Sequence, residues 1–582
     1  MIKKLMKSIR EYKKDSLLSP AMVTLEVIME VIIPMLMARL IDYGIQAQNL
    51  GYIWKMGILL AVTAMISLMF GVLSGKFAAR ASAGFAKNLR KDMYYNVQNF
   101  SFSNIDKFST ASIVTRLTTD VTNVQNAYQM ILRMCMRAPA SMIIAMIMSF
   151  YINARLASIY LVAVILLGTC LFLIMRSATK YFEQAFPKYD ELNASVQENV
   201  SAIRVVKAYV REDYETGKFH KASENIYKIF CKAEENLSFN APLMQLTVYS
   251  CILLISWLGA KMIVGSSLST GELMSLLTYC MNILMSLMML SMVFVMITMS
   301  LASARRISEV LNEKSDLDNP ENPDSSIPDG SITFDHVYFN YKKGAGEPVL
   351  SDINFSIQSG ETIGIIGGTG SAKTSLVNLI SRLYDVTDGS VKVGGKDVRS
   401  YDMETLRNEV AVVLQKNVLF SGTILDNLRW GDKNASEEEC KRVCRLACAD
   451  EFIDRMPEGY NTYIEQGGSN VSGGQKQRLC IARALLKKPK VLILDDSTSA
   501  VDTATDAKIR KALLTEIPET TKLIIAQRIS SVQDADRIIV MENGKVNGFG
   551  SHEELLKTNE IYREVYESQT GGGGDFDEKR GE

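Results

Sequence analysis

Residues 361–375, ETIGIIGGTGSAKTS, decide the fold of the second half of this chain. The apolar run 362–366 indicates a short buried strand, a glycine-rich turn follows it, and 374–384 has the pattern of a helix. Backbone N–H groups of such a turn bind phosphate oxygens, Lys373 adds a positive charge, and the Thr374 hydroxyl can ligate Mg²⁺. The loop departs from the usual G-x-x-x-x-G-K-[ST] pattern at one place, because Ala372 replaces the last glycine.

Two further motifs follow this loop. The segment VLILDDSTSAVD places Asp495 and Asp496 at the end of an apolar strand, where a carboxylate can hold Mg²⁺, commonly through water. In the segment NVSGGQKQRLCIARALL, Ser472, Gly473 and Gly474 open a helix and so provide a second helix start that can bind an anion. The order of the three motifs is far more specific than any one of them alone.

The composition indicates a membrane part joined to a soluble part. Hydrophobic residues make up 47% of the 582 residues although 22% are charged. Basic and acidic residues number 64 each, which gives no support to a nucleic-acid ligand. The nine cysteines form no paired framework, which fits a reducing cytosol. Cys440, Cys444 and Cys448 share one helical face, and a half-buried helix surface is favoured there over a metal site.

Residues 1–312 are predicted to form an all-α transmembrane domain of six helices. The long polar connections after the second and fourth spans carry most of the basic residues, so the positive-inside bias places them and both termini in the cytoplasm. The opening stretch MIKKLMKSIREYKK is basic and amphipathic without a cleavage site, which predicts a helix on the cytoplasmic membrane surface. Crossing the hydrocarbon takes about 20 mainly apolar residues, and the predicted spans are 17–43, 53–75, 131–152, 156–175, 243–264 and 273–299.

Two kinds of residue within the spans are candidates for a substrate cavity. Two acidic residues lie one turn apart on the first span. They either line a cavity that favours cationic or amphipathic cargo, or they sit near a membrane interface or pair with Arg133 or Arg137. The last span is rich in methionine, which is frequent on promiscuous binding surfaces but also fills lipid-facing positions. The candidate cavity residues are Glu26, Glu30, Met285 and Met292.

The soluble part begins after a linker at 313–330 that is rich in Asp, Asn, Pro and Ser. We expect an α/β domain at 331–569 and a flexible tail at 570–582, to which we assign no function. Two strand-like segments, SITFDHVYFNY and VLSDINFSI, precede the phosphate loop. Tyr341 ends the first and is placed to stack on a nucleotide base, although its position alone makes it a strand residue.

These motifs resemble those of the ATP-binding cassette transporters. The resemblance covers nearly the whole chain and includes Gln415 in VAVVLQKN, the signature VSGGQ, and Asp502 in SAVD. FSTASIVTRLTTDV and VKAYVREDYETGKF resemble the two cytoplasmic loops whose turns pass force between ATP sites and membrane helices. The resemblance implies a bacterial exporter-type half-transporter, with a six-helix membrane domain fused to an α/β P-loop nucleotide-binding domain that has a helical subdomain. Two chains would pair so that each ATP lies between one phosphate loop and the other chain's signature.

The resemblance assigns roles to individual residues. ATP and Mg²⁺ are the expected cofactors. We expect nucleotide contacts from Tyr341, Gly367, Gly368, Thr369, Gly370, Ser371, Ala372, Lys373, Thr374 and Ser375, metal contacts from Thr374, Gln415 and Asp495, catalysis from Asp496 and Gln527, and contacts with the partner's ATP from Ser472, Gly473, Gly474 and Gln475.

Three departures from the family pattern concern the chain's own ATP site. Asp496 stands where most active members carry Glu, so its carboxylate is one methylene short, and a misplacement of about 1 Å can cost ~10²-fold in rate. Gln527 replaces the family's switch His and cannot become a cation. Ala372 adds about 1–2 kcal/mol of strain if its φ is positive. Gln466 and Val471 are milder departures near the signature.

We therefore expect a heterodimer in which this chain binds ATP–Mg²⁺ and hydrolyses it slowly, while a partner chain supplies the Glu and His that work against this chain's signature. A slow homodimer is the alternative. The expected function is ATP-driven export of hydrophobic or amphipathic cargo, such as drugs, lipids or peptides, across the plasma (inner) membrane. No peptidase domain precedes the membrane half, which weighs against a leader-processing peptide exporter. An importer on the same fold and an ATP-gated regulatory or channel-like subunit stay open.

Overall fold

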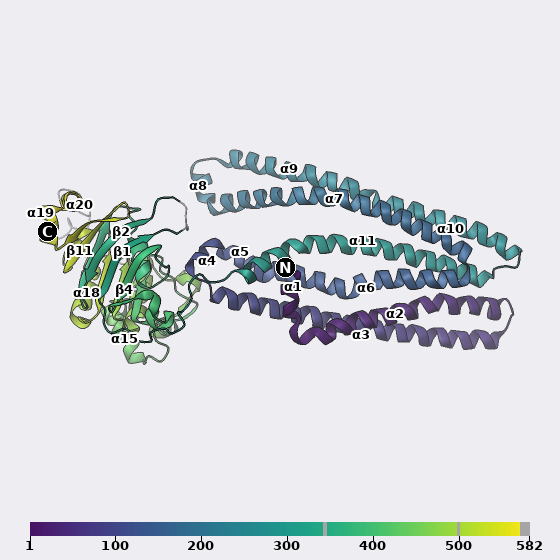
Figure 1. Ribbon diagram of the computed structural model, residues 1–582, viewed down its shortest axis with the longest axis horizontal. Coiled ribbons are helices and arrows are strands. Elements are labelled where there is room, and N and C mark those ends of the chain that lie inside the picture. Colours follow the sequence, from purple (N-terminus) through teal and green to yellow (C-terminus); the bar gives the residue numbers. More distant parts are fainter. Residues whose placement is uncertain (342–345, 498–500, 571–582) are drawn as a thin grey trace. The chain divides into compact units, whose positions relative to one another are not determined.

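The computed structural model describes residues 1–341, 346–497 and 501–570. The chain divides into two compact units (Figure 1). One unit comprises Met1–Asn99 and Phe108–Glu313 and is entirely helical, and the other comprises Phe100–Lys107 and Lys314–Glu582 and is α/β. This confirms the predicted fold class.

The helical unit holds the membrane spans. Each predicted apolar run lies within one long helical segment, so the chain is a multi-pass membrane protein. Within the described ranges, six segments are long and apolar enough to cross a membrane, namely Ile2–Ile45, Leu50–Gln98, Thr110–Ile152, Ala154–Tyr181, Glu212–Val264 and Thr270–Asn312.

Side-chain caps begin some of these helices. Helix α3 (Leu50–Gln98) starts after Asn49, whose side chain accepts a hydrogen bond from the Tyr52 N–H. Helix α11 (Thr270–Asn312) starts with a capping box formed by Ser269 and Glu272. At 1.5 Å per residue, α3 spans about 73 Å, far more than the ~30 Å of hydrocarbon, so the helices extend well beyond the bilayer as predicted.

Apolar stripes and buried hydroxyl groups hold the helical unit together. In Figure 1, α2 (Lys13–Leu40) runs beside α3, and α7 (Ala154–Ser201) runs beside α9 (Glu212–Ser238) and α10 (Asn240–Val264). Buried valines recur every four residues on α2, and the Tyr279 hydroxyl of α11 donates to the Val31 carbonyl at 2.7 Å. Helix α6 (Val121–Ile152) completes this part of the bundle.

The N-terminal stretch differs from the single surface helix that the sequence predicts. It forms a short helix, α1 (Ile2–Leu5), and a 3₁₀ segment, Met6–Tyr12, that is interrupted at Arg10 with φ of 41°. Ser8 donates to Asp92 at 2.8 Å, and Asn88 donates to the Ser8 carbonyl at 3.0 Å. Hydrogen bonds to α3 therefore fix this stretch in a broken conformation.

Two main sheets form the α/β unit. A four-stranded sheet has the order β2-β1-β4-β5, and a six-stranded sheet has the order β12-β11-β3-β10-β9-β6 within the described residues. In the second sheet β3 pairs in parallel with β10 and β10 with β9, so their carboxyl ends lie at one edge. The strands are β1 (Ile332–Phe339), β2 (Leu350–Ile357), β3 (Thr362–Gly367), β4 (Asp388–Val393), β5 (Lys396–Asp397), β6 (Val410–Val413), β9 (Val491–Asp495), β10 (Thr521–Ile525), β11 (Arg537–Glu542) and β12 (Lys545–Gly550), with a small β7 (Gly422–Thr423) and β8 (Tyr463–Ile464) pair.

Helices pack on these sheets and enclose two apolar cores. One core lies around both sheets and the helix after β3, and the other joins the six-stranded sheet to the helical part that contains α15 and α17. Cys440, Cys444 and Cys448 are buried in the second core, and the described residues contain no cluster of three or more metal-ligating side chains. The helices are α12 (Lys373–Ile380), α13 (Met403–Glu409), α14 (Ile424–Leu428), α15 (Glu437–Leu446), α16 (Asp450–Ile453), α17 (Gly473–Leu486), α18 (Thr503–Glu516), α19 (His552–Thr558) and α20 (Glu560–Thr570).

The helix after the phosphate loop is shorter than predicted. The pattern 374–384 suggests continuation to Tyr384, but α12 ends at Ile380. Arg382 adopts a positive φ of 50°, and the Leu383 N–H returns to the Asn378 carbonyl at 3.0 Å. This left-handed residue ends the helix, and the side chain of Arg382 pairs with Asp385.

Candidate nucleotide site

The loop between β3 and α12 forms one wall of a cavity of about 340 Å³. Gly367 has φ of 159°, and an added Cβ there would lie 2.3 Å from the Met541 carbonyl oxygen, so the close approach of β11 requires glycine. Ala372 has φ of 71° and ψ of 24°, the left-handed region that the sequence identified as costly for alanine. The cavity is lined by Val349, Gly367, Thr369, Gly370, Ser371, Ala372, Lys373, Thr374, Ser375, Gln415, Asp495, Asp496, Ile525 and Gln527.

Lys373 carries the main positive charge of this cavity. Its ammonium group donates to the carbonyls of Gly367 and Gly368 at 2.8 and 2.9 Å and to the Ser371 hydroxyl at 3.3 Å. Burial lowers the pKa of Lys373, and the nearby Asp495 opposes this shift. The side chain therefore lies over the loop in which phosphate oxygens would be held by backbone N–H groups.

Thr374 and Asp495 supply an oxygen set suited to Mg²⁺. The Thr374 hydroxyl donates to the Asp495 carboxylate at 2.9 Å, which brings the start of α12 against the end of β9. Burial raises the pKa of the Asp495 carboxyl, and the hydrogen bond from Thr374 opposes that shift. A hydroxyl and a carboxylate that face the same point beside a phosphate loop fit the preference of Mg²⁺ for oxygen ligands. Gln415, also predicted as a metal contact, lines the same cavity.

Asp496 lies beside two amide side chains. Gln527 donates to its carboxylate at 3.0 Å from the loop after β10, and Gln415 donates at 3.4 Å from the loop after β6. The backbone of Asp496 has a positive φ of 46°. The structure thus brings together on one cavity wall the two residues predicted as catalytic and one predicted as a metal contact.

Gln569 was not identified from the sequence, yet it holds the loop that carries Gln527. Its side-chain amide donates to the Gln527 carbonyl at 3.0 Å and accepts from the Ile529 N–H at 2.8 Å. Gln569 lies near the end of α20, forty-two residues after Gln527. A glutamine near the end of a polar helix carries no motif, so the sequence offered no signal for this role.

Tyr341 lies next to the phosphate helix. Its hydroxyl is 2.9 Å from the Ser375 hydroxyl, and its ring meets the Tyr384 ring edge-on with centroids 5.1 Å apart. The Tyr384 hydroxyl donates at 2.7 Å to Asp106 of α4 (Phe102–Lys107), which belongs to the α/β unit. The segment Phe100–Lys107, which belongs to the α/β unit, therefore ends directly before the cytoplasmic-loop motif predicted at 108–121.

The signature residues lie outside this cavity. Ser472 begins α17, where its hydroxyl accepts from the Gln475 N–H at 3.3 Å and the Gln475 side chain accepts from the Ser472 N–H at 2.9 Å. This capping box confirms the predicted helix start. Among the described residues, none of Ser472, Gly473, Gly474 and Gln475 lines the cavity. Asp502 begins α18 by accepting from the Thr505 N–H at 2.9 Å, and this hydrogen bond lowers its pKa.

The membrane candidates separate into two groups. Glu26 and Glu30 of α2 both pair with Arg137 of α6, which is the alternative that the sequence analysis left open. Met285 and Met292 of α11 are 57% and 66% exposed in the single chain, so their side chains are available to a cavity, a partner or lipid.

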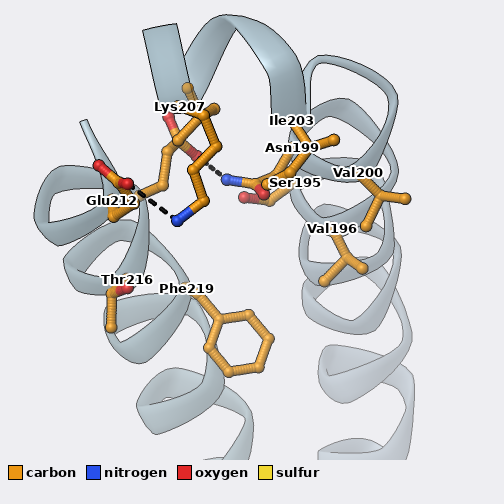
Figure 2. A pocket seen from close by; sticks show the side chains of 11 residues that line it. Ser195, Val196, Asn199, Val200, Ile203, Lys207, Glu212, Thr216 and Phe219 are labelled. Carbon is orange, nitrogen blue, oxygen red and sulfur yellow. Dashed lines mark hydrogen bonds and ion pairs between the residues drawn. The ribbon is translucent and has the colours of Figure 1, made fainter. Parts of the chain in front are cut away.

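A second cavity lies in the other cytoplasmic-loop motif, 206–219 (Figure 2). It measures about 340 Å³ and lies between α7, α8 (Ile203–Ala208) and α9. Apolar side chains such as Val196 and Phe219 line it, and a Lys207–Glu212 ion pair at 2.9 Å crosses its rim. Tyr209 and Val210, at the turn beyond α8, are 75% and 80% exposed, which gives the loop an apolar tip.

Comparisons with known proteins agree with these features. Residues 17–288 match the model of the ABC transporter transmembrane region, and 350–499 match the ABC transporter model. An uncharacterized ABC transporter ATP-binding protein of Bacillus subtilis, YfiB, is 38% identical over 549 residues, covering 94% of this chain and 95% of that protein. An ATP-dependent lipid A-core flippase of Desulfotalea psychrophila is 32% identical over 511 residues, covering 87% and 89%.

A solved structure shows the same fold. The structure of a bacterial Atm1-family ABC exporter with ATP bound superimposes with a TM-score of 0.83 at 24% identity, covering 96% of this chain and 99% of that one.

Proposed function

Because this chain belongs to the ATP-binding cassette (ABC) transporters and has the exporter-type fold, we propose that it is one half of a heterodimeric exporter whose own ATP site binds nucleotide but hydrolyses it slowly. One observation carries the proposal. The cavity that gathers Lys373, Asp495, Asp496 and Gln527 does not include the signature residues at the start of α17. This separation supports a second chain that completes the site with its own signature residues.

The residues of the cavity divide into groups that hold nucleotide and groups that act on it. The loop N–H groups and Lys373 would bind phosphate oxygens, while Thr374 and Asp495 would hold the metal. Mg²⁺, when bound, neutralises charge on the β- and γ-phosphates. Tyr341 is exposed enough to receive the base.

The groups that act on the nucleotide are the ones that depart from the family pattern. Asp496 serves as the base that orients water, from a shorter side chain than glutamate. Gln527 donates a hydrogen bond without a positive charge, and it already bonds to Asp496. Ala372 holds a strained conformation. Because these residues line one cavity, a self-paired chain would have the same weakened site twice. A slow homodimer is the second candidate, since aspartate is still a base.

The cargo is proposed to be hydrophobic or amphipathic, such as a drug, lipid or peptide. One relative is a lipid A-core flippase by name, which supports an amphipathic cargo. The two cytoplasmic-loop motifs, at 108–121 and 206–219, would pass force from nucleotide closure to the membrane helices, and the exposed apolar tip at Tyr209 and Val210 supports this role for the second loop. We place the protein in the plasma (inner) membrane with both termini in the cytoplasm.

The deciding experiment compares the purified chain alone with the chain purified together with a second half-transporter that carries Glu and His at the corresponding positions. In nanodiscs, we expect the chain alone to bind Mg-ATP and hydrolyse it slowly, and the pair to hydrolyse at an ordinary rate. Ordinary turnover by the chain alone would leave the slow-site proposal without support. ATP-dependent accumulation of a fluorescent phospholipid in inside-out vesicles tests export, and flux without accumulation would indicate a gate.

A further inference from the structure

Three charged side chains meet inside the helical unit. Arg137 of α6 donates to Glu26 at 2.6 Å and to both oxygens of Glu30 at 2.6 and 2.8 Å. Two carboxylates therefore share one guanidinium. Arg133 lies one turn earlier on α6 against Gly75 of α3, and among the described residues it has no ion pair with either glutamate. Counted without Arg133, the three side chains Glu26, Glu30 and Arg137 carry a net charge of −1.

The cluster lies deep within the spans. Glu30 is ten residues before the end of α2 at Leu40, which is about 15 Å along the helix and about half the hydrocarbon thickness. Arg137 is six residues after the start of the predicted span 131–152, or about 9 Å along α6. An excess charge at this depth is costly unless a partner or a water-filled cavity compensates it, and such groups face the bundle interior rather than lipid.

One carboxylate oxygen has no partner. Glu26 is 8% exposed, and its Oε2 atom is buried without a hydrogen bond among the described residues. Helix α3 approaches this carboxylate so closely that a Cβ added to Gly71 would lie 2.9 Å from Oε1. The glutamate is therefore fixed by backbone on one side and by Arg137 on the other, while a buried acceptor stays unsatisfied. Such a group costs free energy unless a donor or cation completes it.

The cluster opens on the side of Glu30 and Arg137. Their side chains are 38% and 31% exposed in the single chain, compared with 11% for Glu26. Because charged side chains at this depth do not face lipid, the open side faces either the partner chain or the translocation cavity. A ligand that enters from this side meets Glu30 first and has the charge of Glu26 behind it.

We propose that Glu26 and Glu30, held by Arg137, form a binding site for the cationic head of an amphipathic cargo molecule. This inference rests on the proposed export function and narrows its substrate class to monovalent organic cations. Arg137 positions the two carboxylates and neutralises one of them, so that one charge is left for the cargo. The apolar remainder of the cargo lies against the surrounding apolar spans.

The test is equilibrium binding without nucleotide. Ethidium, a fluorescent organic cation, is titrated into the purified transporter in nanodiscs of phosphatidylcholine, and dihydroethidium, its uncharged reduced form kept free of air, serves as a neutral competitor of similar size. We expect the competitor to have little effect. Glu30→Gln and Glu26→Gln, which neutralise the cluster, should each weaken ethidium binding by about tenfold or more, equivalent to about 1.4 kcal/mol. Glu191→Gln, at an exposed ion pair on α7, is the matched control and should not change binding.

The outcomes that would overturn this site can be told apart from a failure of export. Wild-type affinity in Glu30→Gln, or equal competition by dihydroethidium, would overturn the proposal. Stronger binding of the anion anilinonaphthalene sulfonate than of ethidium, abolished by Arg137→Gln, would also overturn it by indicating an anion site. Glu30→Gln decides the matter if Glu26→Gln fails to fold, because Glu30 is partly exposed. Vesicle export of a fluorescent phospholipid by the wild type is scored separately, so a failure of export is not confused with a failure of this site.

Discussion

Replacing Asp496 by glutamate should restore hydrolysis at this chain's own ATP site. The Asp496 carboxylate lies 3.0 Å from the Gln527 amide and 3.4 Å from the Gln415 amide on the cavity wall. One added methylene moves the carboxylate outward by about 1 Å, a distance worth ~10²-fold in rate. That factor corresponds to about 2.7 kcal/mol of activation free energy. With Gln527→His in the same chain, the gain should be at least as large.

The size of the gain depends on the partner. For the chain alone in nanodiscs, phosphate release should rise about 10²-fold, because every site it can form carries the change. When the variant is paired with a chain whose own Glu and His are intact, the total rate should rise at most about twofold, since one competent site already turns over. The same substitution thus separates the contribution of this chain's own site from that of the site completed by the partner's Glu and His.

Asp495→Asn in the same background is the control, because it removes the carboxylate that Thr374 contacts and should abolish the gain. Affinity for a fluorescent ATP analogue should be unchanged by Asp496→Glu, which separates binding from chemistry. If the variant binds ATP normally and hydrolyses it no faster in either arrangement, then the length of the side chain is not the cause of slow turnover and the reasoning fails.

Three further predictions concern the α/β unit. Ala372→Gly should remove about 1–2 kcal/mol of left-handed strain, less about 0.5–1 kcal/mol of added chain entropy, and raise the unfolding midpoint in denaturant; a lower midpoint would contradict the strain. Tyr384→Phe should remove the hydrogen bond to Asp106, worth about 0.5–1.5 kcal/mol, and so speed amide exchange several-fold over α4; unchanged exchange would show that the bond is not needed. The hydrogen bond that the protonated His336 ring donates to the Asp352 carboxylate raises the pKa of His336, so the stability that this pair contributes is full below the ordinary histidine pKa and lost as pH rises through the raised value. A pH series of unfolding midpoints should show this loss in the wild type and not in Asp352→Asn.

Local patterns predicted the parts of the protein that depend on neighbouring residues in the sequence. The strand, turn and helix around Lys373 and the apolar runs of the six spans were confirmed, because burial periodicity and helix capping act over a few residues. The sequence pattern predicted the end of α12 too far along the chain, because the left-handed residue that ends this helix is Arg382 and not a glycine. The domain boundaries stay a prediction.

Contacts between distant residues escaped the sequence. Gln569 of α20 donates a hydrogen bond to the loop that carries Gln527. Tyr384 donates to Asp106 of α4, which lies 278 residues earlier in the sequence. Arg137 pairs with both glutamates of α2. Each of these contacts joins elements whose relative position is set by packing rather than by any local motif. The sequence left Arg133 and Arg137 open as partners of Glu26, and the structure shows that Arg137 is the partner.

The distribution of unusual residues supports the proposed slow ATP site. Ala372, Asp496 and Gln527 all line one cavity, while Lys373 and Thr374 in the same cavity keep the family's residue types. Outside it, the helix start at Ser472 keeps both hydrogen bonds of its capping box. A site that must hold ATP and close, but need not cleave it quickly, requires the phosphate-holding groups and the signature helix start. It also requires a supported Gln527 loop, which Gln569 provides through two hydrogen bonds.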